Sequence, residues 1–431
     1  MTMGKSEIDE GNAFLEIKSK IKQNVIKQVT SQRELADEQL VKLIDQEILG
    51  FGEVTFITIE QKVRLRKELY NSLRRLDVLQ ELVDDASVTE IMINGAKNIF
   101  IERKGRITKC EQEFESDIRL QDVIQTIVSG TNRIVNESSP IVDARLQDGS
   151  RVNVVLPPIA LDGPILTIRK FPEKPITMEG LIEFGALTPQ VADFLCILVK
   201  AKYNIFISGG TGSGKTTFLN ALSNYIPEDE RIITIEDSAE LQIRSIVNLV
   251  RLECRNANVE GKNAITIRDL IKSSLRMRPD RIVVGEIRDS AAIDLLAAYN
   301  TGHDGSLSTG HANSVKDMLN RLEALVLQGV DMPVQAIRKQ ISSAIDIIVH
   351  LGRLRDKSRK VLEISEVLEV SGEEIIVNPL YQFVMNEDRD AKEIGKLERS
   401  RNPLINTEKL QRAGLQIIEC NKNDNEELVS T

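Results

Sequence analysis

Three absences narrow the class of protein to which this sequence can belong. The four cysteines stand singly, at Cys110, Cys196, Cys254 and Cys420. Because no C-x-x-C pair occurs, the sequence supports neither a zinc site nor a disulfide framework. Tryptophan is absent and aromatic residues make up only 4% of the chain, so no base-stacking platform for nucleic acid is evident. No apolar run approaches the ~18–20 residues of a membrane helix, and we therefore expect no membrane span.

A net positive charge is also missing. The formal net charge is −9, which argues against nucleic acid as the main ligand but leaves room for a local basic face. Residues 1–14 lack the apolar core of a signal peptide, so we expect a cytoplasmic protein. With 431 residues, of which 41% are hydrophobic and 28% charged, the chain is long enough for two or three globular domains.

The chain is organised around residues 203–217, YNIFISGGTGSGKTT, in which an apolar β-prone run leads into glycines. This stretch fits the pattern G-x-x-x-x-G-K-[ST], in which bare backbone N–H groups and a helix N-terminus surround phosphate oxygens. The pattern assigns Lys215 to the β- and γ-phosphates and the Thr216 hydroxyl to Mg²⁺. The predicted nucleotide-binding residues are Gly209, Gly210, Thr211, Gly212, Ser213, Gly214, Lys215, Thr216 and Thr217.

The first three parts of the chain precede this loop. Residues 1–80 carry apolar side chains at four-residue steps, which predicts amphipathic helices. These helices either pack on a neighbouring part of the chain or form a docking surface for a membrane partner. Residues 81–171 alternate in short runs separated by turn signals, which predicts a small α+β domain. Residues 172–178 contain two prolines and are predicted to be a linker.

The last two parts differ sharply in composition. In residues 179–385, short apolar strands alternate with amphipathic helices, which predicts an α/β fold with a mostly parallel sheet covered on both faces. Residues 386–431 are polar, and we expect them to be a loosely held tail.

Two of the predicted strands end in carboxylates, which phosphoanhydride hydrolysis requires near the γ-phosphate. The segment TIEDSAE contributes Glu236, Asp237 and Glu240, and the segment IVVGE contributes Glu286. An acidic cluster directly after a buried strand is costly unless it meets a cation. The alternative is that these side chains are solvated or cap a helix.

Two of the three histidines lie within nine residues, at His303 and His311 in the segment TGHDGSLSTGHANS. The segment has no nearby cysteine and does not match a zinc pair. The two imidazoles are able to hydrogen-bond phosphate or to relay the nucleotide state, unless they are ordinary surface-loop histidines. His350 stands in an apolar strand, where a histidine is more often structural.

Four stretches together resemble one family. In order, GGTGSGKTT, TIEDSAEL, RPDRIVVGEIRD and TGHDGSLSTGHANS are similar to the phosphate loop, Asp box, Walker B segment and His box of the type II/type IV secretion ATPases. The segments ELVDDASVTEIMINGAKNIFIERKGRI and SAIDIIVHLGRLRD resemble the CpaF-type branch, which drives assembly of tight-adherence (Tad/Flp) pili. The resemblance covers about residues 75–385 well.

The resemblance implies a homo-hexameric ring of two-domain subunits, each with a RecA-like P-loop domain, ATP and Mg²⁺ as ligands, and a polytopic inner-membrane platform protein as partner. The ring would lie at the inner face of the cell membrane. The family pattern makes Glu240 the catalytic base, while Glu286 positions water and Mg²⁺. By the same resemblance, the planar forks of three arginines reach the γ-phosphate, namely Arg145, Arg151 and Arg169.

The resemblance leaves some alternatives open. A DNA-transfer ring ATPase of the same family is the second possible function, although an acidic chain argues against direct nucleic-acid contact. A non-catalytic scaffold is disfavoured because Lys215, Glu240 and Glu286 are all present. The arginines act either within one subunit, by closure around the linker, or across the ring on a neighbour's nucleotide.

Overall fold

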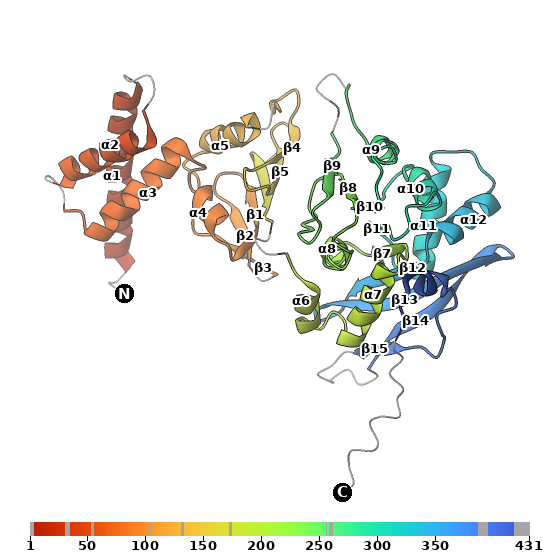
Figure 1. Ribbon diagram of the computed structural model, residues 1–431. Coiled ribbons are helices and arrows are strands. Elements are labelled where there is room, and N and C mark those ends of the chain that lie inside the picture. The colour runs from red at the N-terminus through yellow and green to blue at the C-terminus, as the bar shows by residue number, and fades with distance from the viewer. Residues whose placement is uncertain are drawn as a thin grey trace, which may run out of the picture. The chain divides into compact units, whose positions relative to one another are not determined.

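The chain is described by a computed structural model that covers residues 4–30, 35–52, 56–103, 105–130, 133–171, 175–255, 257, 262–386 and 395–417 (Figure 1). The chain divides into two compact units, Met1–Glu173 and Lys174–Thr431. None of the helices in the described residues has the length and apolar character needed to cross a bilayer.

The first unit begins with three helices that share a core of their own, α1 (Gly4–Thr30), α2 (Asp37–Gly52) and α3 (Ile59–Arg74). The apolar residues spaced along each helix meet in this core, and its members are Ile21, Val25, Leu40, Ile44, Ile48, Ile57, Leu65 and Leu69. A capping box at Thr58 and Gln61 begins α3. The helices therefore pack on one another, which satisfies the apolar stripes predicted for residues 1–80.

A six-stranded antiparallel sheet makes up the rest of the first unit, in the order β3-β2-β1-β6-β5-β4. Helix α4 (Leu79–Asp84) precedes it, and α5 (Asp117–Ser129) packs its apolar side on the buried side chains of the sheet. Buried residues alternate with more exposed ones along the central strands β1, β6 and β5, which leaves one face for this core. The strands are β1 (Val88–Asn94), β2 (Ile99–Arg103), β3 (Arg106–Lys109), β4 (Ile141–Arg145), β5 (Arg151–Val155) and β6 (Ile165–Arg169).

The second unit is built on a nine-stranded sheet in the order β15-β14-β13-β12-β7-β11-β10-β8-β9. Six neighbouring strands run parallel to one another, namely β9, β8, β10, β11, β7 and β12. Strands β13, β14 and β15 extend the sheet in antiparallel orientation. The predicted mostly parallel α/β fold is therefore confirmed. The strands are β7 (Ile205–Gly209), β8 (Ile232–Glu236), β9 (Leu249–Glu253), β10 (Arg281–Val284), β11 (Leu307–Gly310), β12 (Ile347–Arg353), β13 (Arg359–Ser371), β14 (Glu374–Met385) and β15 (Gly395–Arg399).

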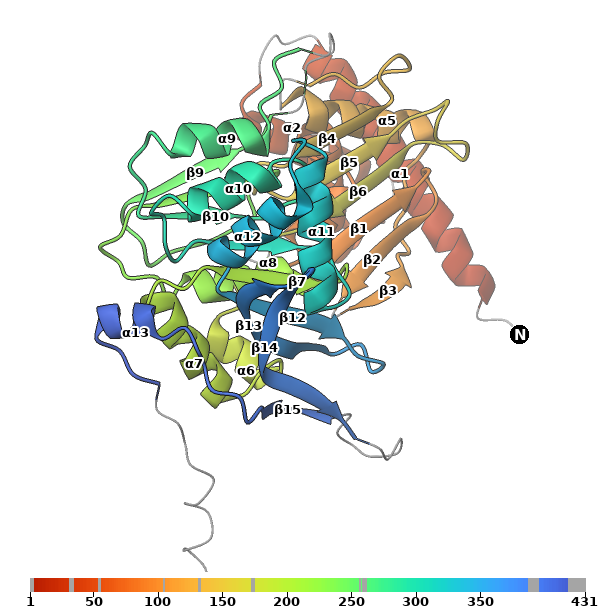
Figure 2. The ribbon, with the colours of Figure 1, turned by 90° about the vertical axis from the view of Figure 1, so that its right-hand side faces the viewer.

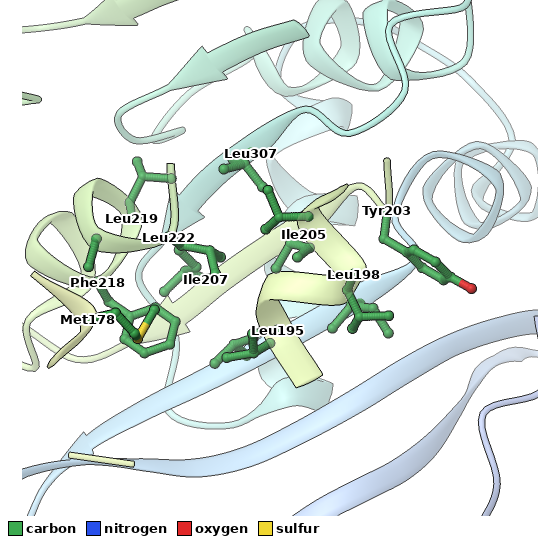
Figure 3. Close-up of a cluster of buried hydrophobic side chains, with 14 of the residues drawn as sticks. Met178, Leu195, Leu198, Tyr203, Ile205, Ile207, Phe218, Leu219, Leu222 and Leu307 are labelled. Atoms are coloured by element: carbon green, nitrogen blue, oxygen red, sulfur yellow. The ribbon is translucent and has the colours of Figure 1, made fainter. Parts of the chain in front are cut away.

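Helices cover both faces of this sheet because its central strands are apolar on both sides (Figures 1 and 2). On one face, Ile205 and Ile207 of β7 meet side chains of α7 and α8, as Figure 3 shows. On the other face, Phe206 belongs to the core formed with α9 to α12. The helices are α6 (Met178–Glu183), α7 (Pro189–Lys200), α8 (Lys215–Ser223), α9 (Ile267–Ser274), α10 (Ala292–Tyr299), α11 (Val315–Leu327) and α12 (Val334–Ala344).

The end of the chain differs from the predicted loose tail. Strand β15 and helix α13 (Glu408–Ala413) belong to the second unit. Glu366 of β13 is 1% exposed and accepts hydrogen bonds from the backbone N–H groups of Ile405 at 3.0 Å and Asn406 at 2.7 Å. A carboxylate far upstream therefore anchors this polar segment, which local composition cannot reveal. Residues 387–394 and 418–431 of the predicted tail and residues 172–174 of the predicted linker lie outside the described residues.

Candidate active site

The phosphate loop connects the end of β7 to the start of α8. Gly212 and Gly214 have φ angles of +72° and +95°, in the left-handed region that glycine adopts without strain. At Gly209 a Cβ would lie 2.5 Å from the carbonyl oxygen of Leu351 in β12, so only glycine fits between the two strands. The loop geometry therefore requires the glycines that the sequence pattern places there.

Lys215 is enclosed by the loop that it follows. Its Nζ donates to the carbonyls of Gly209 and Gly210, each at 3.1 Å, and lies 3.1 Å from Nδ1 of His311. The side chain is only 7% exposed, and this burial lowers the pKa of Lys215, an effect that the negative charge of Glu286 opposes. A buried ammonium group with carbonyl partners is well placed to exchange them for the oxygens of a phosphate.

The acidic segments and one histidine meet the phosphate loop at the same edge of the sheet. Gly310 of β11 is paired with Ser208 of β7, and Val284 of β10 is paired with Ile235 of β8. The carboxyl ends of these parallel strands therefore lie together. His311 follows β11 directly, and its Nε2 lies 2.9 Å from Oε1 of Glu286. His311 thus stands between the Lys215 ammonium and the Glu286 carboxylate.

Glu236, the last residue of β8, is buried beside Gly285. Its Oε2 accepts hydrogen bonds from the backbone N–H groups of Glu240 at 2.7 Å and Leu241 at 3.0 Å. Burial raises the pKa of Glu236, which these two N–H groups partly offset. A Cβ on Gly285 would lie 3.0 Å from Cγ of Glu236, so the missing side chain at 285 makes room for this carboxyl group. Glu236 therefore fixes the segment that carries Glu240, whose side chain is half-buried.

Arg288 is a site residue that the sequence reasoning did not select. Its Nη2 donates to Oε2 of Glu286 at 2.8 Å, and its Nη1 lies 3.7 Å from Oδ2 of Asp237. The guanidinium group joins the carboxylates that follow β8 and β10. The signal was available in the sequence, because Arg288 follows Glu286 by two residues at the end of an apolar strand.

His303 and His311, which are close in sequence, do not lie together in the structure. His303 precedes β11, at the edge of the sheet opposite the phosphate loop, and its Nδ1 lies 3.0 Å from the carbonyl oxygen of Ala298 in α10. The prediction of a nucleotide contact therefore finds support in the position of His311 and none in that of His303. His350 is buried in β12, with Nδ1 3.2 Å from Oγ of Ser208, as expected of a structural histidine.

The donors near the loop suit a magnesium ion that is shared with a nucleotide. Thr216 lies in the first turn of α8, and the Glu286 carboxylate lies at the same edge. Within the described residues, no group of three or more His, Cys, Asp and Glu side chains could hold a metal ion on its own. This donor set fits Mg²⁺, which in nucleotide sites is usually bound through one or two protein ligands together with phosphates and water.

A cavity of about 220 Å³ adjoins the phosphate loop. One side is formed by loop residues and the start of α8, and another by the hairpin between β12 and β13. The apolar part of the wall comes mainly from Ile176, Leu181, Phe184, Phe218 and Leu351. Apolar walls next to a phosphate-binding loop suit a flat nucleotide base.

The three predicted arginines form a row across the sheet of the first unit. Arg145 of β4 pairs with Arg151 of β5, Arg151 pairs with Arg169 of β6, and Arg169 pairs with Glu90 of β1. Directly paired residues of antiparallel strands lie on the same face, where neighbouring like charges repel each other. Arg169 also forms an ion pair with Glu90, with Nη2 3.6 Å from Oε1. The contact of the three arginines with the γ-phosphate stays a prediction.

Comparisons with known proteins identify the family of the chain. A family model described as "Type II/IV secretion system protein" matches residues 73–427. A putative conjugal transfer protein of Mycobacterium tuberculosis is 33% identical over 311 residues, covering 70% of this chain and 88% of its own. Conjugal transfer protein TrbB of Rhizobium radiobacter is 35% identical over 308 residues, covering 70% and 90%. The fold is similar to that of the ATPase DotB of Yersinia pseudotuberculosis, with a TM-score of 0.50, 19% identity and coverage of 68% and 78%.

Proposed function

The chain belongs to the type II/IV secretion system protein family and is a P-loop ATPase of that family, and on this premise we propose that it is a ring motor powering assembly of Tad/Flp pili. The observation that carries the proposal is the meeting of Lys215, His311 and Glu286 at the phosphate loop. The segments that resemble the CpaF-type branch support the narrower choice of pathway.

ATP binding follows from the loop and the cavity beside it. The backbone N–H groups of residues 210–215 and the start of α8 receive the phosphates, and Lys215 exchanges its carbonyl partners for phosphate oxygens. The base enters the cavity next to Phe184 and Phe218. Thr216 and Glu286 hold Mg²⁺, which neutralises charge on the phosphates when it is bound.

The carboxylates have different roles in hydrolysis. Glu240 acts as the base that accepts a proton from the attacking water, because Glu236 holds its segment through two backbone hydrogen bonds. Glu286 orients the water, and its contacts with His311 and Arg288 keep the carboxylate in place before nucleotide binds. In this proposal His311 reports whether its neighbour Lys215 has exchanged its carbonyl partners for phosphate oxygens.

The arginine row supplies further positive charge to the γ-phosphate. Charge-assisted bonds from Arg151 and Arg169, with Arg145 beside them, form only while that phosphate is present. We place these contacts within one subunit, because the arginines precede the predicted linker and the phosphate loop follows it. Closing on ATP and opening after hydrolysis would then provide the power stroke.

The working unit in this proposal is a homo-hexamer in the cytoplasm, bound at the inner face of the membrane to a polytopic platform protein. Family membership supports the ring. Helices α1–α3 have a core of their own, and they give the first unit a surface in addition to that of its sheet. Direct contact with nucleic acid is not part of the proposal, because the net charge of the chain is −9.

Purified protein should hydrolyse ATP with a rate that rises more steeply than linearly with protein concentration. In a ring, neighbouring subunits organise each site, so dilute monomers should be slow. Phosphate release and light scattering should be followed together across the assembly range. A strictly linear rate over that range would contradict the ring motor, and the absence of any ATP hydrolysis at high concentration would contradict the proposed function itself.

A mixing experiment tests the arrangement of the arginines. Lys215→Ala subunits keep their arginines, whereas Arg151→Ala/Arg169→Ala subunits keep their phosphate loop. If the arginines act within one chain, no subunit in a mixture has a complete site, and ATP hydrolysis should remain at background. Each variant mixed with wild-type protein serves as the control for subunit exchange. Recovery of activity in the mixture of the two variants would show that the arginines act between chains.

DNA transfer is the second candidate function, because two relatives at 33% and 35% identity are described as conjugal transfer proteins. The two functions separate when single- or double-stranded DNA is added to the ATPase assay at physiological salt. A pilus motor should show no stimulation by either form. Stimulation that falls steeply with added salt would favour DNA transfer.

A further inference from the structure

The hairpin between β12 and β13 touches the phosphate loop at two points. In β12, the carbonyl oxygen of Leu351 approaches Gly209 so closely that no side chain fits there. In β13, Nε of Arg359 donates a hydrogen bond to the carbonyl oxygen of Gly212 at 2.9 Å. The stem of Arg359 also passes over Gly214, where a Cβ would lie 3.5 Å from its Cδ. The hairpin therefore contacts both the beginning and the end of the loop.

The base of this hairpin is firmly held. Lys360 donates from Nζ to the carbonyl oxygen of Gly185 at 2.6 Å, and the N–H of Val361 donates to the carbonyl of Ala186 at 2.9 Å. Val361 is also paired with Leu351 across the two strands. Arg359 is thus presented to the phosphate loop from a sheet strand, and its backbone position does not depend on the loop.

Holding a carbonyl in this loop matters because each peptide carries its N–H and C=O in opposite directions. A loop that binds phosphate through N–H groups must turn the corresponding carbonyls away. Lys215 engages the carbonyls of Gly209 and Gly210, and Arg359 engages that of Gly212. Gly212 has a φ of +72° and no side chain, so its peptide has little intrinsic resistance to turning over.

We propose that Arg359 is a positioning residue of the nucleotide site. By holding the Gly212 carbonyl, its guanidinium group keeps the N–H of Ser213 on the opposite side of the same peptide, directed to the inside of the loop. That N–H makes only a long bond of 3.3 Å to the carbonyl of Gly210 and is available to a phosphate oxygen. Arg359 also lines the cavity beside the loop, and the role assigned to it is the hold on the Gly212 carbonyl. The inference rests on the proposed function, because it assumes that the loop binds a nucleotide.

The test compares Arg359→Ala with Arg353→Ala in the full-length protein. Arg353 of β12 pairs directly with Arg359 across the hairpin and is exposed, so its replacement removes the same charge from the same hairpin. Calorimetry should give dissociation constants for ADP and for Mg²⁺-ATP that rise roughly 5- to 10-fold in Arg359→Ala, the size expected for one charge-assisted hydrogen bond in a partly exposed place. Arg353→Ala should match the wild type.

Steady-state kinetics gives the second readout. KM for ATP should rise in Arg359→Ala while kcat stays within about twofold, since the loop positions the phosphates before and during the reaction alike. Arg359→Lys should recover only part of the affinity, because an ammonium group lacks the fixed Nε–H. Equal affinities in Arg359→Ala and Arg353→Ala would overturn the inference. Weakening confined to ATP would also overturn it, because that result indicates direct contact with the γ-phosphate.

Failure of this inference can be told apart from failure of the proposed function. If wild-type protein binds neither ADP nor Mg²⁺-ATP, the nucleotide site itself is refuted. If wild-type protein binds both and Arg359→Ala binds them equally well, only the role of Arg359 is refuted. Thermal unfolding of the variant without nucleotide should match the wild type, because Arg359 is exposed.

Discussion

Lys215→Ala should show no ATP hydrolysis above a control without enzyme. The Lys215 ammonium group is the buried cation of the phosphate loop, held by two carbonyls that a nucleotide would replace. Loss of a single donor to transition-state charge lowers kcat by roughly 10²–10³-fold in other enzymes. Lys215 supplies a full positive charge as well as donors, so the loss should be at least as large. Phosphate release is the measurement.

The matched control for this experiment is Lys339→Ala. Lys339 is an exposed lysine on α12, in the same unit. This variant should hydrolyse ATP like the wild type. Because removal of Lys215 leaves two loop carbonyls without their cation, the thermal unfolding curves of both variants should also be recorded. Substantial turnover by a folded Lys215→Ala protein would place the active site elsewhere.

The phosphate loop could be predicted from sequence because all of its chemistry is local. Its glycines, lysine and hydroxyl residues stand within one strand–loop–helix unit, and their spacing alone specifies the backbone shape. The close approach of Leu351 to Gly209 and the bond from Arg359 to Gly212 are different in kind. They depend on the pairing of β7 with β12, which no local pattern contains.

Closeness in sequence did not predict closeness in space for the two histidines. His303 and His311 are close in sequence, but β11 lies between them and carries the chain from one edge of the sheet to the other. Only the histidine that follows the strand reaches the phosphate loop. The rule that ligands bind at the carboxyl ends of parallel strands separates the two, because His303 precedes β11 and His311 follows it.

The relation between Glu236 and Gly285 was equally hidden. The sequence places three glutamates at or after the ends of apolar strands, and Gly285 directly before Glu286. The pairing of β8 with β10 places that glycine against the Glu236 side chain. Glu236 therefore supports the segment that carries Glu240. This difference in role between the two carboxylates depends on a contact between two strands.

Glu240→Gln and Glu286→Gln should still bind nucleotide, while their turnover should drop by roughly 10²-fold or more. Each amide keeps the shape of the carboxyl group and loses its negative charge. Glutamine at 240 cannot accept the proton of the attacking water. Glutamine at 286 weakens the hold on water and Mg²⁺, and also the contacts with His311 and Arg288. Calorimetry with Mg²⁺-ATP and single-turnover hydrolysis separate binding from chemistry.

Glu236→Gln is the informative third variant. An amide oxygen at 236 can still accept the hydrogen bonds from the N–H groups of Glu240 and Leu241, so the segment should keep its position. Burial raises the pKa of Glu236, so the site already favours a neutral group there more than solvent does. We therefore expect turnover to fall less than about tenfold, far less than in Glu240→Gln. The opposite order, with Glu240→Gln active and Glu236→Gln inactive, would transfer the role of catalytic base to Glu236 and leave Glu240 as part of its support.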